Sequence, residues 1–278
     1  MEPFRFLFMA DCQLGCYATF SGADEAAIAG FAGRGMQVES SPATSGFEWD
    51  ATRLREAVAA TNRLAPEFVV MGGDMVDDAA DDAQYAAVRS ITADLEVPMH
   101  WAPGNHDVAW DARTPTEDSL AAYRDRFGPN RYSFTHRGVG FVVIDTTLWG
   151  RPEQLQRQAA DQVTWLERTL GELRSGGVGR ILAFGHHPPF LESAAEEDTY
   201  WTIPTGHRRT LVDLLVGHEV QTMFCGHWHR NGGATDEGLE VAVTGPVGYP
   251  LGADPSGFRI VDVAADDVRH QYVSLEEV

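Results

Sequence analysis

The chain has 278 residues, of which 44% are hydrophobic and 22% charged, and its formal net charge is −20. This composition is typical of a globular protein with a substantial core, and no apolar run approaches the ~20 residues that a membrane span requires. The negative charge argues against broad binding to polymeric nucleic acid or to anionic membranes, because both need Lys and Arg to neutralise phosphates.

Strand-like and helix-like segments alternate through the first half, which predicts layered α/β packing. The predicted strands share a short apolar run and lie at Phe4–Met9, Phe68–Met71 and Val97–Trp101. The predicted helices share apolar residues at helical spacing and lie at Trp49–Leu64, Asp81–Leu95 and Thr116–Phe127.

The second half opens with a predicted β-hairpin, Tyr132–Thr135 and Val139–Asp145, joined by Arg137 and Gly138. Further elements alternate helix and strand, at Ala159–Arg174, Ile181–Phe184, His207–Val216 and Val220–Phe224. The end of the chain predicts antiparallel strands, at Leu239–Thr244, Phe258–Val263 and Val268–Val273.

The segment Gln13–Phe47 is long, rich in Gly, Ala and Ser, and weakly patterned. A loop of this length in a compact domain is often functional. Two interpretations follow: a rim or lid over a site, or a disordered surface insertion.

Charged clusters outside the motifs predict solvated surface. The acidic clusters Asp77–Asp82 and Glu196–Asp198 fit this interpretation. Three arginines either meet a phosphate or are solvated: Arg208, Arg209 and Arg230.

The cysteines do not predict a disulfide framework. They are Cys12, Cys16 and Cys225, and we expect buried or incidental thiols. The opening residues lack the basic start and small-residue cleavage site of a signal peptide. We therefore expect a cytoplasmic protein.

Polar residues recur directly after the short apolar strands. They are Asp11 with Gln13, Asp74, Asn105 with His106 and Asp107, His186 with His187, and His227 with His229. Each alone has an ordinary interpretation as a turn or loop residue. Because the carboxyl ends of strands converge on one crevice in α/β sheets, their recurrence predicts a single site.

The predicted ligands also indicate the metal. Carboxylate, amide oxygen and imidazole together suit Mn, Fe or Zn, and the lack of a thiolate set argues against a structural zinc. Two such metals about 3.5–4 Å apart, bridged by one carboxylate, can clamp a phosphate. The sequence therefore predicts a two-metal phosphoester site.

The order of motifs, D-x-x, GD, GNHD, H-x-P and GHxH, resembles that of the calcineurin-like metallophosphoesterases over nearly the whole chain. The resemblance implies one calcineurin-like phosphoesterase domain over residues 1–278. It implies a four-layer α/β/β/α sandwich with two mixed sheets. The implied activity is hydrolysis of a phosphate ester by direct attack of a metal-bound hydroxide.

The resemblance also implies roles for the site residues. The first metal would be surrounded by Asp11, Gln13, Asp74 and His229, with Asp74 bridging to the second. The second would be completed by Asn105, His186 and His227. His106 would stabilise transition-state charge and protonate the leaving oxygen, while Asp107 would either orient His106 or shape the loop.

The first motif departs from the general D-x-H pattern, because Gln13 stands where the family has His. A neutral amide is a poorer transition-metal ligand than imidazole, so the first metal is expected to bind less tightly. The chain resembles the subfamily of calcineurin-like phosphoesterase domain-containing protein 1, which also carries D-x-Q, with matching stretches at Ala10–Gly15 and Gly226–Asn231.

That closer resemblance implies a phosphomonoesterase acting on phosphoserine or phosphothreonine in proteins. Two alternatives stay open: a phosphodiesterase for nucleotide or lipid headgroup diesters, and a metal-poor binding or regulatory relative. The sequence does not predict an oligomeric state.

Overall fold

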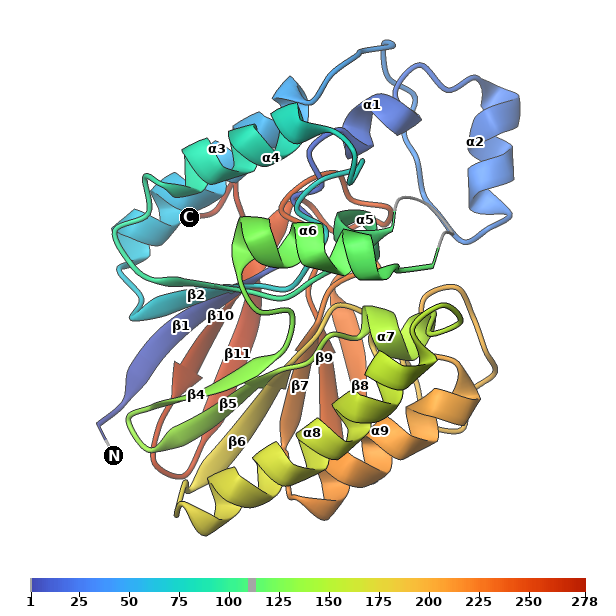
Figure 1. Cartoon of the computed structure of the whole chain (residues 1–278). Coiled ribbons are helices and arrows are strands. Elements are labelled where there is room, and N and C mark those ends of the chain that lie inside the picture. The colour runs from blue at the N-terminus through green and yellow to red at the C-terminus, as the bar shows by residue number, and fades with distance from the viewer. Residues whose placement is uncertain (1, 110–113) are drawn as a thin grey trace.

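A core of phenylalanine side chains joins two β-sheets that face each other. The computed structural model describes residues 2–109 and 114–278. Helices cover the outer face of each sheet, so the molecule has four layers in the order α/β/β/α (Figure 1). The predicted α/β sandwich with two mixed sheets is confirmed.

The first sheet has five strands, and three neighbouring strands at one side of it are parallel to one another. Its order is β11 (Val268–Ser274), β10 (Gly257–Val263), β1 (Phe4–Met9), β2 (Phe68–Met71) and β3 (Met99–Trp101). Strands β1, β2 and β3 are parallel, whereas β10 runs antiparallel to β1 and to β11. This sheet is therefore mixed, as predicted.

The second sheet has six strands. Its order is β4 (Tyr132–His136), β5 (Val139–Val143), β6 (Arg180–Phe184), β7 (Thr222–Cys225), β9 (Leu239–Val243) and β8 (Gly232–Asp236). The four inner strands are parallel, and the two edge strands are antiparallel to their neighbours. Each sheet thus contains a set of parallel strands whose carboxyl ends lie at one edge of that sheet.

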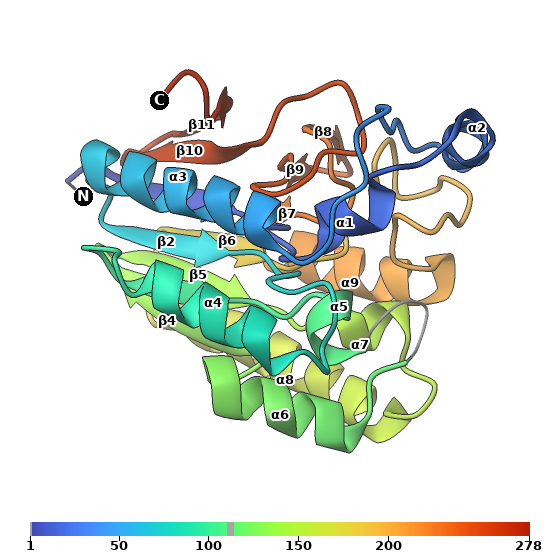
Figure 2. The same ribbon diagram turned by 90° about the horizontal axis from the view of Figure 1, so that it is seen from above.

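The long helices pack on the outer faces of the sheets. Over the first sheet lie α3 (Glu48–Leu64) and α4 (Asp82–Thr92), which run side by side in Figure 2, with α6 (Glu117–Phe127) beside them. Over the second sheet lie α8 (Gln156–Ser175) and α9 (Thr205–Gly217). No helix of the described ranges is long and apolar enough to cross a membrane.

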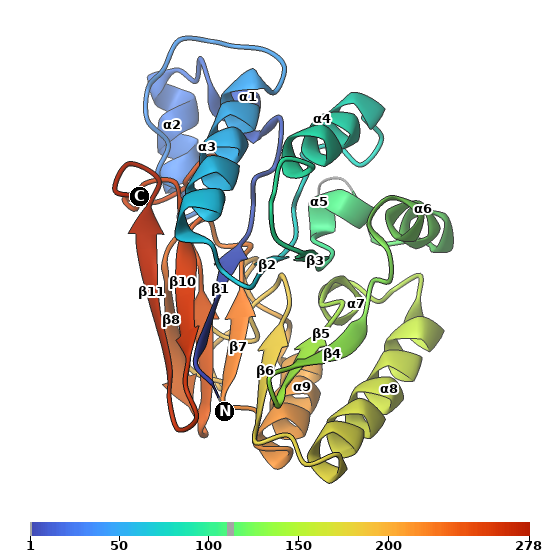
Figure 3. The same cartoon turned by 90° about the vertical axis from the view of Figure 1, so that its left-hand side faces the viewer.

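The short helices gather at one end of the molecule. They are α1 (Cys16–Phe20), α2 (Glu25–Ala32), α5 (Asn105–Val108) and α7 (Thr147–Gly150). Figure 3 shows α1, α2 and α5 beyond the ends toward which β1 and β2 run. These are the carboxyl ends of the parallel strands, where the sequence predicts the site.

Two expectations about the elements are corrected. Leu239–Thr244 was expected in a purely antiparallel end, but β9 pairs parallel with β7 and antiparallel only with β8. The β8–β9 hairpin reverses the chain, and this reversal gives β9 the direction of β7. Of the two interpretations of Gln13–Phe47, a disordered surface insertion is corrected, because the segment contains α1 and α2.

Alternation along β1 explains the packing of the two sheets. Successive side chains of a strand point to opposite faces. Leu7 and Met9 join the core beneath α3 and α4, whereas Phe6 faces the second sheet. The inter-sheet core includes the rings of Phe4, Phe6, Phe8, Phe68, Phe141, Phe184 and Phe224.

Phe6 lies at the centre of this inter-sheet core and is fully buried. Its ring stacks on Phe68 at 5.0 Å between centroids. It meets Phe141 and Phe184 edge-on at 5.8 and 5.7 Å. These contacts span both sheets, so the ring ties one sheet to the other.

We predict that Phe6→Ala lowers the free energy of unfolding by about 3–5 kcal/mol, because a large buried side chain leaves a cavity between rigid sheets. Urea denaturation followed by circular dichroism measures the change. Arg157→Ala, at an exposed position of α8, serves as the control and should change stability by less than about 0.5 kcal/mol. Equal stability of Phe6→Ala and wild type would contradict the central role of this ring.

Candidate metal centre

Two groups of buried side chains bring their potential ligand atoms within 4.8 Å of one another. One group is Asp11, Asp74 and His229, and the other is Asp74, His186 and His227. Asp74 belongs to both groups. Asp11 and Asp74 follow β1 and β2 of the first sheet, whereas the histidines follow β6 and β7 of the second. The site is therefore built across the two sheets.

The Asp74 carboxylate lies at the centre of these groups. Its Oδ2 lies 3.0 Å from Nε2 of His186, and its Oδ1 accepts the backbone N–H of His106 at 2.8 Å. Burial alone would raise the pKa of Asp74, but the neighbouring imidazoles outweigh burial and hold the pKa well below its usual range. Asp74 is therefore the anion around which the site is arranged.

Asp11 is the second buried carboxylate of the site. Both of its oxygens accept the backbone N–H of His227 at 3.1 Å. Burial raises the pKa of Asp11 to about 8, with Asp74 adding to the rise and His186 opposing it. Two carboxylates this close and this deeply buried are best ionised together when cations lie between them.

Backbone carbonyls fix the orientation of the three histidines. In each ring one nitrogen faces a carbonyl oxygen: His186 Nδ1 with Gly72 at 2.9 Å, His227 Nε2 with Tyr200 at 3.2 Å, and His229 Nδ1 with Tyr249 at 2.7 Å. Because a carbonyl only accepts, that nitrogen donates its proton, and the other nitrogen is free to bind metal.

The ionisation of the imidazoles agrees with this arrangement. Burial lowers the pKa of His227 to about 3 and that of His229 to about 4, so both are neutral at pH 7, which is the form that binds metal. His186 differs, because Asp74 outweighs burial and raises its pKa to about 9. A metal ion held by His186 and Asp74 would displace that proton.

The Gln13 side chain fits a metal ligand. Its Nε2 donates to Oδ1 of Asp77 at 2.9 Å, which leaves its carbonyl oxygen directed away from that contact. This Oε1 is buried and has no hydrogen-bond partner among the described residues. A buried oxygen without a partner is costly, and a cation would satisfy it.

Asn105 and His106 begin α5 at the end of β3. Oδ1 of Asn105 lies 3.2 Å from Nε2 of His186, beside the second group of ligands. Nδ1 of His106 lies 2.7 Å from the Asp77 carbonyl, so this nitrogen is the donor. Burial lowers the pKa of His106, but the charges of Asp74 and Asp77 outweigh it and raise the pKa above its ordinary value.

Comparison with known proteins agrees with this geometry. The calcineurin-like phosphoesterase family matches residues 4–231. The chain belongs to the calcineurin-like phosphoesterase family. It is therefore a hydrolase of phosphoesters, and membership implies a dinuclear metal site.

Two proteins of similar sequence and one solved structure of similar fold can be compared with this phosphoesterase. Serine/threonine-protein phosphatase CPPED1 of Homo sapiens is 31% identical over 99% of this chain and 85% of its own length. A protein of Rhodococcus erythropolis named as a probable cyclic nucleotide phosphodiesterase is 26% identical over 81% of this chain and 76% of its own. A dimetal phosphatase from Danio rerio has the same fold, with a TM-score of 0.70, 17% identity and coverage of 99% and 97%.

The structure brings the predicted site residues of the phosphoesterase together, and Asp107 among them contacts backbone amides. The carboxylate of Asp107 accepts the backbone N–H groups of Asp74, Met75 and Gly104, each at 2.8 Å. It is buried and holds the two ligand-bearing loops together. Of the two roles expected for Asp107, this geometry fits the shaping of the loop, although its charge also raises the pKa of His106 to a smaller extent.

Two residues at the site were missed from the sequence. Asp77 was expected on a solvated acidic surface, but it binds Gln13 and His106, and this expectation was wrong. The signal was its position three residues after Asp74, in the same turn. The Oγ1 of Thr146, after β5, accepts the N–H groups of His186 and His187 at 2.9 Å, and nothing in the sequence marked it.

The three arginines considered for phosphate contact are all engaged elsewhere. Arg208 is fully buried and donates to the carbonyls of Ile203 and Glu196. Arg209 pairs with acidic neighbours on the surface. Arg230 donates to the carbonyls of Leu251 and Gly35. Arg208 and Arg230 therefore hold loop carbonyls, and Arg209 holds surface carboxylates, instead of a phosphate.

The backbone at the site lies in a rarely used conformation. Five site residues that are not glycine have positive φ: Asp11 at 55°, Gln13 at 31°, Asp74 at 51°, His227 at 70° and His229 at 52°. Such residues cost about 1–3 kcal/mol each and concentrate at functional sites. The fold thus places these side chains against local backbone preference.

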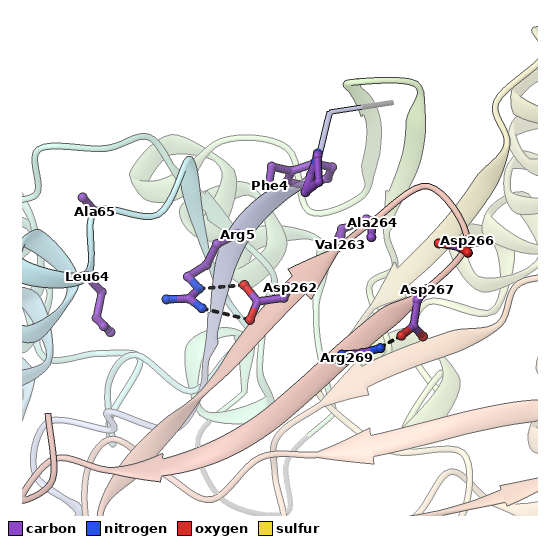
Figure 4. Close-up of a pocket in the computed structure, with 11 residues that line it drawn as sticks. Phe4, Arg5, Leu64, Ala65, Asp262, Val263, Ala264, Asp266, Asp267 and Arg269 are labelled. Carbon is purple, nitrogen blue, oxygen red and sulfur yellow. Dashed lines mark hydrogen bonds and ion pairs between the residues drawn. The ribbon is translucent and has the colours of Figure 1, made fainter.

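A cavity of about 590 Å³ lies at the end of β1 that is remote from the metal centre. Figure 4 shows Arg5 directed at Asp262, with hydrogen bonds of 2.7 and 2.9 Å, and Arg269 paired with Asp267 at 2.6 Å. Both cations that line this cavity are already paired with carboxylates. It therefore has little to offer an anionic substrate.

We predict that Gln13→His tightens the first metal by about tenfold or more, because imidazole is a stronger transition-metal ligand than an amide. Gln13→Ala should weaken the same metal, since the buried oxygen is lost. Titration of the chelator-treated protein with Mn²⁺, followed by calorimetry, measures both. An unchanged titration in both variants would show that Gln13 is not a ligand.

A buried carboxylate on α3 anchors the loop that follows Gln13. Asp50 accepts the backbone N–H of Gly15 at 3.0 Å and that of Tyr17 at 3.3 Å. Burial raises the pKa of Asp50 to about 7. The folded protein therefore holds this proton more tightly than the unfolded chain, and the contribution of Asp50 to stability falls as the pH rises from about 4 to 7.

We predict that Asp50→Asn gains stability relative to wild type across that pH interval, by an amount on the order of 3 kcal/mol. Unfolding with urea between pH 4 and 7.5, in the presence of chelator, measures the difference. The metal ligands titrate in both proteins and cancel from the comparison. Asp161→Asn, at an exposed position, is the control and should show no such trend. If the stabilities of Asp50→Asn and of wild type changed with pH in parallel, the raised pKa of Asp50 would be refuted.

Proposed function

We propose that this chain is a dinuclear metal phosphomonoesterase whose substrates are phosphoserine and phosphothreonine in proteins. The observation that carries the proposal is the sharing of Asp74 between two groups of ligand atoms. The substrate class is supported by the serine/threonine-protein phosphatase named among the relatives, which aligns over 99% of this chain.

In this proposal the first metal would be held by Asp11, Gln13 and His229, and the second by Asn105, His186 and His227, with Asp74 available to both. Oxygen and imidazole donors suit Mn, Fe or Zn. Bound metals supply Lewis acidity, which activates a water for attack on phosphorus and neutralises the phosphate oxygens.

His106 is the proposed general acid. Its Nδ1 is fixed by the Asp77 carbonyl, so its Nε2 is the nitrogen available to the substrate. Asp74 and Asp77 raise the pKa of His106 above its ordinary value, which favours the protonated ring whose Nε2–H would donate to the departing oxygen. Asp107 is a positioning residue, since it holds the amides of Asp74 and Gly104.

The same proposal treats residues 1–278 as one domain that acts in the cytoplasm. A single inter-sheet core with side chains from both sheets supports one domain. Three free cysteines, Cys12, Cys16 and Cys225, support a reducing compartment.

A phosphodiesterase is the second candidate, because one relative carries that name over 81% of this chain. The two activities use the same ligands, and they differ in whether the site accepts a phosphate with a second ester group. Turnover of p-nitrophenyl phosphate and of bis-p-nitrophenyl phosphate by metal-loaded protein distinguishes them, and we expect the monoester to be preferred.

We predict that Asp74→Asn lowers the monoesterase rate by more than about 100-fold and lowers the metal content, because the bridge loses its charge. His106→Gln is the matched variant: it should lower kcat by about 10²–10⁴-fold with metal content retained. Elemental analysis and phosphate release measure the two effects. A wild-type protein without metal or turnover would overturn the proposal in favour of a binding protein.

A further inference from the structure

A cavity of about 780 Å³ opens beside the metal centre. One side is formed by residues of the site: Gln13, Asp74, Asp77, His106, His227 and His229. The rest of the lining includes large apolar side chains, here named the apolar wall: Phe20, Phe31, Met36, Trp201 and Leu251. A phosphate group alone fills only a small part of such a cavity, whose size is that of a site for a larger ligand.

The apolar wall is fixed in place by packing. Phe20 meets Phe31 edge-on at 5.1 Å and stacks on Tyr249 at 5.6 Å. Arg230 connects the two segments behind it, because its guanidinium donates to the carbonyls of Leu251 and Gly35. The wall therefore presents a preformed apolar surface to the reacting phosphate.

Arg34 brings a positive charge to the same cavity. Its guanidinium carbon lies 5.0 Å from the centroid of the Phe31 ring, and its side chain lines the cavity. It forms no ion pair with any carboxylate of the described residues. In a chain with a net charge of −20, an arginine without a carboxylate partner beside a substrate cavity is available to an acidic group of the ligand.

We propose that this cavity selects the peptide sequence around the phosphorylated residue. The apolar wall takes a large apolar side chain next to the phosphoserine or phosphothreonine, and Arg34 pairs with a carboxylate of the same peptide. The inference rests on the proposed function. A nucleotide, whose base stacks on aromatic rings, is the competing occupant, and AMP therefore enters the test below.

The test uses metal-loaded protein and two phosphoserine hexapeptides that differ only in Phe or Ser beside the phosphoserine. We expect kcat/KM to be about 10- to 100-fold higher for the Phe peptide, since burial of the ring adds binding energy. Phe31→Ala should abolish most of that preference and leave the rate on glycerol 2-phosphate unchanged. Glu25→Ala, at an exposed position of the same helix and outside the cavity, is the matched control.

Arg34→Gln tests the charge. It should lower kcat/KM for a Phe peptide that also carries Glu. Arg34→Lys keeps the positive charge and should retain most of the wild-type kcat/KM on that peptide. Equal rates on the Phe and Ser peptides, or a Phe31→Ala loss that appears equally with glycerol 2-phosphate, would overturn the specificity site. AMP is tested as a third substrate. If Phe31→Ala lowered the rate on AMP and left the rate on the Phe peptide unchanged, the site would belong to nucleotides and the proposal would be overturned. Absence of wild-type turnover on every monoester would instead refute the proposed function.

Discussion

One buried charge, the carboxylate of Asp74, governs the arrangement of the site. Burial opposes the ionisation of this group, and two features compensate for it: imidazoles from the second sheet and an amide N–H at the start of α5. The inter-sheet core has to place β2 and β6 so that Asp74 and His186 meet at 3.0 Å. The position of this one anion therefore depends on how the two sheets pack against each other.

The sequence predicted this part of the structure well, because two simple signals coincided there. Short apolar runs indicated the parallel strands, and polar residues directly after each run indicated the edge at which the strands end. Asp11, Asp74, His186 and His227 are brought together as those signals predicted. Asp77 and Thr146 were not identified, because each acts through one hydrogen-bonding geometry that residue type and spacing do not encode.

The segment between Gln13 and Phe47 shows where sequence reasoning ends. Its small residues give little periodicity, and its helices depend on contacts with Tyr249, Leu251 and Trp201, which lie about two hundred residues away. Such contacts become visible only in three dimensions. The segment carries no metal ligand after Gln13, so its side chains can vary without changing the chemistry, and the shape of the substrate cavity can vary with them.

The site across the two sheets also has a consequence for folding. Asp11 and His229, which belong to one group of ligands, lie near opposite ends of the chain, and one metal bound by both would close most of the chain into a loop. A crosslink over so long a loop removes much of the conformational entropy of the unfolded chain, as a disulfide does. Bound metals would then stabilise the whole fold against unfolding, in a protein whose three thiols form no disulfide.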